Sequence, residues 1–146
     1  MKDLRSTARI VLLILMMVWA GMILGISFIA TPVKFRAPSL TMPVGLEVGR
    51  YTYRLFTAVE LWLLIAVIVS GAIAQPRWIS VLALAFVALQ LLVQHYWLLP
   101  ALDARVSQIL AGGQILFSTS HWVYGAFEGV KATLLIAAAS IEIAKR

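Results

Sequence analysis

Four ionisable side chains interrupt the long apolar runs of this sequence, and their types are suited to two kinds of chemistry. They are Glu60, His95, Glu128 and Lys131. Carboxylates and an imidazole together form a common ligand set for a divalent metal ion. Ionisable groups within apolar segments also serve as proton relays and ion pathways in membrane proteins. The residues therefore indicate either a metal site made of Glu60, His95 and Glu128, or a site that binds or passes a proton, a small ion or a solute.

The last apolar run carries a regular series of polar residues. The series comprises His121, Tyr124, Glu128 and Lys131, at intervals of three, four and three residues. In an α-helix, residues three or four positions apart lie on the same face. The spacing therefore predicts a polar ridge along one helix. We expect Glu60 and His95 to meet this ridge from two other helices, at a similar depth.

A purely structural role would use the same side chains. Glu60 or Glu128 would pair with Lys131 and His95, and this internal network would fix how the helices pack. An enzyme is not expected, because the sequence has no cysteine, no phosphate-binding loop and no hydrolase signature such as HExxH. A haem group is not expected either, since His95 and His121 differ in depth and no haem-attachment motif is present.

The composition requires a membrane. Hydrophobic residues make up 62% of the chain and charged residues 12%, whereas soluble domains carry about 25% charged residues. The net charge of +6 comes from basic residues at the ends of apolar runs, where lipid headgroups bind them. The clustered basic patch expected of a nucleic-acid-binding protein is missing. The lipid bilayer is therefore the expected partner, and nucleic acid is not.

Four apolar runs have the length of a membrane-spanning helix, which is about 20 residues. They cover residues 10–30, 55–74, 78–99 and 122–144. Backbone groups in lipid must form hydrogen bonds within their own segment, so each run should be helical. The sequence predicts an all-α, four-helix antiparallel transmembrane bundle that forms a single domain over residues 1–146. A small excess of Lys and Arg on the side of the termini favours cytoplasmic termini in a bacterial inner membrane.

The connection between the first two runs, residues 31–54, is rich in proline. Pro32 is expected to end the first helix, and Pro38 and Pro43 to keep the following segment non-helical. Lys34 and Arg36 would then lie at the level of the headgroups. We expect this stiff segment to fold as a loop over the polar cluster.

The segment GISFIATPVKFRAPS, residues 25–39, combines a small residue, an aromatic residue, a proline and a phenylalanine near the end of the first helix. This pattern resembles the family typified by transmembrane protein 205. The likeness continues through Leu102, Asp103 and Arg105 into His121, Tyr124, Glu128 and Lys131. The resemblance implies a four-helix membrane domain and no established chemistry.

Two functions remain open from the sequence. The first is a small integral membrane protein that binds or passes a small ion, proton or solute at the polar cluster. The second is a structural or accessory subunit that docks membrane proteins, lipids or a second copy of itself, with a cluster that serves only packing. Gly21 and Gly25, and also Gly125 and Gly129, form GxxxG pairs, which we expect to pack helices closely within the chain.

Overall fold

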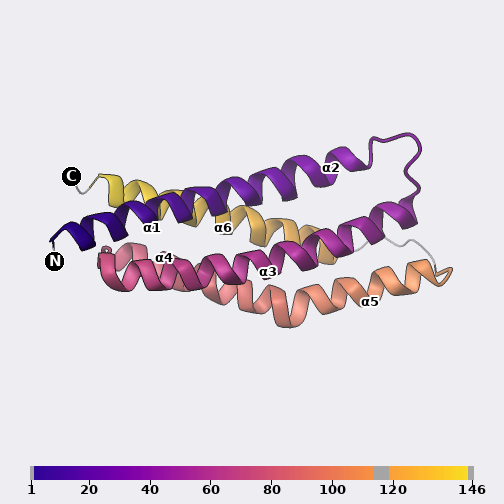
Figure 1. Cartoon of the computed structure of the whole chain (residues 1–146). Helices are drawn as coiled ribbons and strands as arrows, with labels where there is room; N and C mark the ends of the chain where they lie inside the picture. Colours follow the sequence, from indigo (N-terminus) through magenta and orange to yellow (C-terminus); the bar gives the residue numbers. More distant parts are fainter. Residues whose placement is uncertain (1, 114–118, 145–146) are drawn as a thin grey trace.

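The computed structural model describes residues 2–113 and 119–144, and this part of the chain forms four long helices without a strand (Figure 1). The first continuous helix comprises α1 (Lys2–Ile23), a π-helical segment (Leu24–Ala30) and α2 (Thr31–Lys34). The second is α3 (Met42–Ala74). The third comprises α4 (Trp78–Val93), a second π-helical segment (Gln94–Leu98) and α5 (Leu99–Leu110), and the fourth is α6 (Thr119–Ile143). The predicted all-α fold is confirmed.

The helices run side by side, with both ends of the chain at the same end of the bundle (Figure 1). The tight turn between α3 and α4 lies at that end too, and the connection between α2 and α3 lies at the other. Three continuous helices, Lys2–Lys34, Met42–Ala74 and Trp78–Leu110, are long and apolar enough to cross a membrane. Helix α6 is not in this group.

The prediction that Pro32 ends the first helix is wrong. The helix continues to Lys34, and the π-helical segment Leu24–Ala30 directly precedes the proline. Local π geometry and Thr side chains satisfy the backbone groups that a proline leaves free in such helices. Here the Thr31 hydroxyl and the Thr31 backbone N–H both donate to the carbonyl of Ile26, the hydroxyl at 2.8 Å. Pro100 repeats the arrangement, since it follows the second π-helical segment and the helix continues to Leu110.

The long loop predicted for residues 31–54 is therefore short. Helix α3 begins at Met42, with Pro43 in its first turn, where a proline needs no backbone hydrogen bond. Only residues 35–41 connect the two helices. Glu60 lies 18 positions beyond Met42 on α3, which corresponds to about 27 Å along the axis. The connection therefore does not lie over the polar cluster as a lid.

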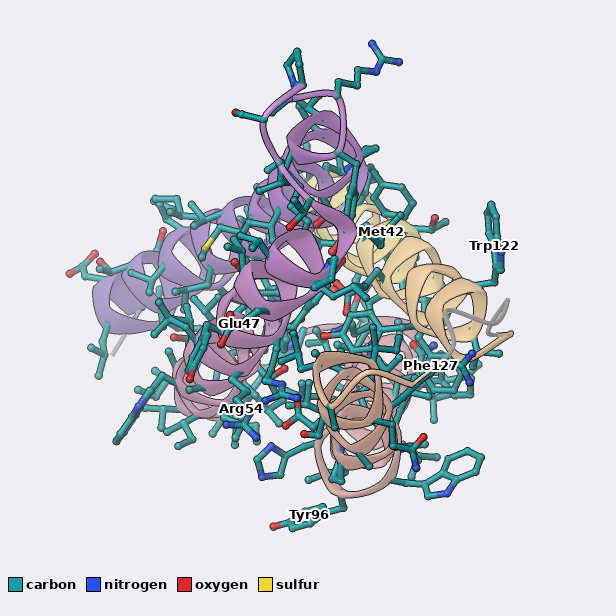
Figure 2. All side chains as sticks on the ribbon, turned by 90° about the vertical axis from the view of Figure 1, so that its right-hand side faces the viewer. Met42, Glu47, Arg54, Tyr96, Trp122 and Phe127 are labelled. Atoms are coloured by element: carbon teal, nitrogen blue, oxygen red, sulfur yellow. The ribbon has the colours of Figure 1, made fainter. Side chains whose placement is uncertain are left out.

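The core is a narrow apolar seam between α1, α3, α4 and α6. It includes Leu12, Met16, Trp19, Val67, Val87 and Leu135, each at most 1% exposed. Many other large apolar side chains point outward, and Figure 2 shows Tyr96 and Trp122 projecting from the bundle. An apolar exterior around a polar interior site is the arrangement expected of a protein in lipid.

The GxxxG pairs do not pack the helices in the way expected. A Cβ on Gly21, Gly25 or Gly125 would meet no neighbouring atom within 4 Å, and only Gly129 approaches another side chain. The close contacts are made instead by the pair Gly45 and Gly49 at the start of α3. A Cβ on Gly45 would lie 2.5 Å from the Phe35 ring, and one on Gly49 would lie 2.6 Å from the Lys34 ammonium. The close packing therefore secures the α2–α3 connection.

Candidate functional site

A buried group of three charged residues lies between α3 and α6, and we refer to Glu60, Glu128 and Lys131 as the triad. The Lys131 ammonium lies 2.5 Å from Glu60 Oε1 and 2.9 Å from Glu128 Oε1. All three side chains are 0% exposed. The single ammonium therefore bridges two carboxyl groups from different helices, out of contact with solvent.

Polar side chains from the other helices complete the surroundings of the triad. The indole N–H of Trp19 on α1 donates to Glu60 Oε1 at 2.9 Å. The Gln94 amide donates to Glu128 Oε1 at 2.8 Å, and the Ser27 hydroxyl reaches Glu128 Oε2 at 3.4 Å. Each of the four long helices thus contributes to one hydrogen-bonded site.

Two of these contacts come from the π-helical segments. Ser27 lies within Leu24–Ala30, and Gln94 is the first residue of Gln94–Leu98. A π turn inserts extra residues into a helix and thereby rotates the side chains that follow, and such turns are frequent at functional sites. The prolines that require these turns are therefore linked to the geometry of the triad.

The structure does not bring His95 to the triad. Gln94 faces Glu128, and successive residues of a helix point in different directions. His95 lies instead on the side of the bundle that also carries Arg54 and Tyr96 (Figure 2), with its ring 4.8 Å from the Tyr96 ring. In the part of the chain that the structure describes, no group of three His, Cys, Asp or Glu residues is arranged to hold a metal ion. The metal site predicted from Glu60, His95 and Glu128 is therefore not formed.

The polar ridge predicted on the last helix forms as expected over its described length. Tyr124, Glu128 and Lys131 are all buried, whereas the side chain of His121 lies outside the described residues. A matching series on α3 consists of Tyr53, Thr57 and Glu60. The two ridges therefore face each other across the interior of the bundle, where their side chains meet.

The facing ridges extend the site as a column toward the end of the bundle where α2 meets α3. The rings of Tyr53 and Tyr124 contact each other edge to face, with centroids 4.6 Å apart. The hydroxyls of Tyr124 and Thr57 are both buried and have no hydrogen-bond partner among the described residues. The Tyr53 hydroxyl is 3.1 Å from Thr31 Oγ1. We refer to Thr31, Tyr53, Thr57 and Tyr124 as the hydroxyl column.

The two basic residues predicted to cover the cluster lie at the far end of this column. Lys34 is half-buried and lines a cavity that Thr31 and Tyr53 also line, and Arg36 is exposed. A separate groove along α6 is lined by Ser27, Phe28 and Gly129. Because Ser27 contacts Glu128, the groove reaches the edge of the triad.

A third buried carboxylate, Glu142, lies outside the triad, near the chain termini. It is 1% exposed and accepts hydrogen bonds from the Arg77 amide at 2.7 Å and from the Ser80 hydroxyl at 2.8 Å. Arg9 also donates to the Glu142 carbonyl. These contacts join the end of α6 to the starts of α1 and α4. Glu142 is thus held by a set of donors that gives it a structural role.

Comparison with known proteins found no match among protein-family models, curated proteins or solved structures.

Proposed function

We propose that the triad reversibly binds one proton within the membrane. The observation that carries this proposal is the composition of the site: two carboxyl groups share one ammonium, and all three are 0% exposed. If both carboxyl groups were ionised, the site would hold an unpaired negative charge, which is strongly unfavourable away from water. One added proton makes the triad neutral. Two carboxyl groups that share a site commonly retain one proton in this way.

The proposal includes α6 as a fourth membrane-crossing helix. Its polar side chains Tyr124, Glu128, Lys131 and Glu142 are buried. The exposed hydroxyls of Thr133 and Ser140 donate to backbone carbonyls of their own helix. The outward face carries exposed apolar side chains, among them Trp122, Val130, Ile136 and Ile143. A helix whose charged groups are covered by protein presents a largely apolar face to lipid. With four crossings, we infer that both termini lie on the cytoplasmic side of a bacterial inner membrane, as the basic residues favour.

Access to the proton is proposed from one end of the bundle. The hydroxyl column leads from the triad toward the α2–α3 connection, and hydroxyl groups both donate and accept hydrogen bonds. On the other side of the triad, Leu12, Met16 and Leu135 form an apolar layer with 0% exposure. This asymmetry favours a binding site with one-sided access over an open channel.

Infrared difference spectroscopy of the protein in liposomes would test the proposal, since it detects the C=O stretch of a protonated carboxyl group. Wild-type protein should have a carboxylic acid band whose intensity changes with pH. Glu60→Gln and Glu128→Gln should each lose that band, because the remaining carboxylate then pairs with Lys131 and stays ionised. Glu47→Gln, which removes an exposed carboxylate from α3, should retain it.

An unchanged band in both triad variants, with folding verified by circular dichroism, would exclude the triad as the proton site. A band that appears only when sodium is removed would identify a sodium ion in place of the proton.

A role as an accessory subunit is the second candidate. It is favoured by the hydrogen bonds that Trp19 and Gln94 supply to the triad, because a packing network has the same features. The outward faces of the helices would then dock other membrane proteins or lipids. Triad variants that lose stability without any change in protonation would support this function.

A further inference from the structure

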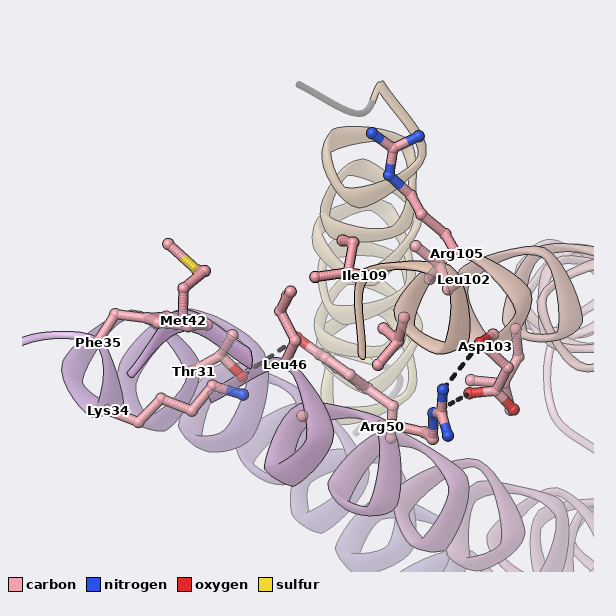
Figure 3. Close-up of a pocket in the computed structure, with 14 residues that line it drawn as sticks. Thr31, Lys34, Phe35, Met42, Leu46, Arg50, Leu102, Asp103, Arg105 and Ile109 are labelled. Atoms are coloured by element: carbon pink, nitrogen blue, oxygen red, sulfur yellow. Dashed lines mark hydrogen bonds and ion pairs between the residues drawn. The ribbon is translucent and has the colours of Figure 1, made fainter. Parts of the chain in front are cut away.

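A cavity at the end of the bundle where α2 meets α3 has the features of a ligand site distinct from the triad. We refer to it as the Lys34 cavity (Figure 3). It lies between α2, α3 and α5 and has a volume of about 160 Å³. Its walls are mostly apolar and include Leu46, Leu99, Leu102, Val106 and Ile109. A cavity of about 150 Å³ lined by such side chains can hold one benzene molecule.

The charged residues around this cavity are predominantly basic. Lys34, Arg50 and Arg105 line it together with a single acidic residue, Asp103. Asp103 is already engaged, because its carboxylate lies 2.6 Å from Arg54 and its carbonyl accepts from Arg50 at 3.0 Å. In Figure 3 the Arg50 side chain extends toward Asp103, whereas the Lys34 side chain extends toward Thr31 and Leu46. The basic charge at the Lys34 side of the cavity is thus not neutralised by Asp103.

Two nitrogen donors at the cavity are incompletely bonded within residues 2–113 and 119–144. The Lys34 ammonium has no carboxylate partner there, and its recorded contact is with the Phe35 ring, 4.9 Å from the centroid. Arg50 Nε is buried without a hydrogen bond, because its ion-pair partner Asp103 Oδ1 lies 3.7 Å away. The terminal Nη2 of the same guanidinium is already bonded. Buried donors are normally satisfied, and unsatisfied ones are unfavourable. An anionic group in the cavity would supply the missing acceptor.

Gly49 is the feature that allows Lys34 to reach this position. A Cβ on Gly49 would lie 2.6 Å from the Lys34 ammonium, so any other residue at position 49 would displace that group. The absence of a side chain thus lets an ammonium lie against the α3 backbone at the cavity wall. This close approach positions the positive charge beside an apolar space instead of in the surrounding solvent.

We propose that the Lys34 cavity binds a small apolar monocarboxylate, of the size of benzoate. The apolar part would fill the space between α3 and α5, and the carboxylate would accept hydrogen bonds from Lys34 and Arg50. Charge-assisted hydrogen bonds of this kind are stronger than neutral ones. Thr31 and Tyr53 belong both to this cavity and to the hydroxyl column. The proposal concerns binding alone and does not depend on proton binding at the triad.

Equilibrium binding of radiolabelled benzoate to full-length protein in phosphatidylcholine nanodiscs would test the proposal, with empty nanodiscs to subtract partitioning into lipid. Wild-type protein should bind benzoate saturably, and unlabelled benzyl alcohol, its neutral analogue, should compete poorly. Lys34→Gln should weaken binding by about tenfold or more, because it removes a charged hydrogen-bond donor. Lys2→Gln removes an exposed lysine at the opposite end of the bundle and should bind as wild type does.

Gly49→Ala provides a second variant that keeps every charge. It should also weaken benzoate binding, because the added methyl group displaces the Lys34 ammonium. Gly21→Ala is the matched control, since a methyl group there meets nothing within 4 Å. Circular dichroism would verify that each variant is folded. Absence of saturable binding, equal affinities of the Lys34→Gln and Lys2→Gln variants, or equally effective competition by inorganic phosphate would overturn the proposal.

Discussion

Replacing the two carboxyl groups of the triad, singly and together, tests whether they share one ammonium. In Glu60→Gln the amide oxygen can still accept from both Trp19 and Lys131, which now share Glu60 Oε1. The amide nitrogen takes the place of Oε2, which has no hydrogen bond among the described residues. The ammonium keeps one ionised partner, Glu128, at 2.9 Å. We therefore expect this variant to lose only about 1 kcal/mol of stability.

The same reasoning applies to Glu128→Gln, in which Lys131 keeps Glu60 as its partner at 2.5 Å. The double variant differs in kind, because it leaves a buried ammonium with no counter-charge. Removing the partner of a buried charge costs about 3–5 kcal/mol. The two substitutions should therefore be non-additive, with a coupling energy of about 1–3 kcal/mol, which is within the range found for residues in contact.

The assay is a double-mutant cycle of unfolding free energies in mixed detergent micelles, with the fraction of SDS increased and helix content followed by circular dichroism. Glu47→Gln, alone and added to each triad variant, is the control, since Glu47 is exposed on the same helix as Glu60. It should show no coupling to either triad residue. Additive effects of the two triad substitutions, or a single substitution as costly as the pair, would refute the view that either carboxylate suffices to neutralise Lys131.

Two further predictions concern packing. Trp19→Phe should lower the free energy of unfolding by about 1.5–3 kcal/mol in the same assay, because it removes the hydrogen bond to Glu60. A change below about 0.5 kcal/mol, the usual scale of surface substitutions, would show that this bond is unimportant. Gly45→Ala should destabilise the protein by about 1–3 kcal/mol through overlap with Phe35, whereas Gly21→Ala should be neutral or stabilising by up to about 1 kcal/mol. Equal effects of the two alanine substitutions would contradict the packing described here.

The sequence was sufficient to predict the side chains that repeat along α6. Intervals of three and four residues identify Tyr124, Glu128 and Lys131 as one face of a helix. The high cost of a charged group in lipid then requires that face to be covered. Glu60 follows by the same argument, because an isolated carboxylate within an apolar run needs a partner. These predictions depend only on helical periodicity and on electrostatics, both of which can be read from one sequence.

The other contacts of the site depend on which face of each apolar helix is turned toward the interior of the bundle. In the third long helix, Gln94 lies seven positions beyond Val87, and both are buried, whereas the adjacent His95 faces another side. The sequence shows both residues but does not reveal which face of the helix is covered. Glu142 escaped notice because it is close to the polar end of the chain, where carboxylates are ordinarily exposed.

The structure also links the prolines to the chemistry proposed for the triad. A straight α-helix through Pro32 or Pro100 would lack a backbone hydrogen bond and would crowd the preceding turn. The π-helical segments avoid this conflict, and they carry the two side chains, Ser27 and Gln94, that contact Glu128. A proline substitution would therefore be expected to change the surroundings of the triad as well as the local helix. The segment around Pro32 can therefore influence the surroundings of the triad without lying over it.

Proton binding at the triad requires a path from one end of the bundle, whereas proton movement across the membrane requires a path from both ends. Lys131 and Glu142 are eleven positions apart on α6, or about 17 Å along its axis. Leu135 and Ala138 lie between them and are 0% exposed, packed against the apolar seam. No hydroxyl column like that beside Tyr53 continues through this layer in the described part of the chain. A proton held by the triad would therefore exchange at the α2–α3 end, and transfer to the other side would require α1 and α6 to separate.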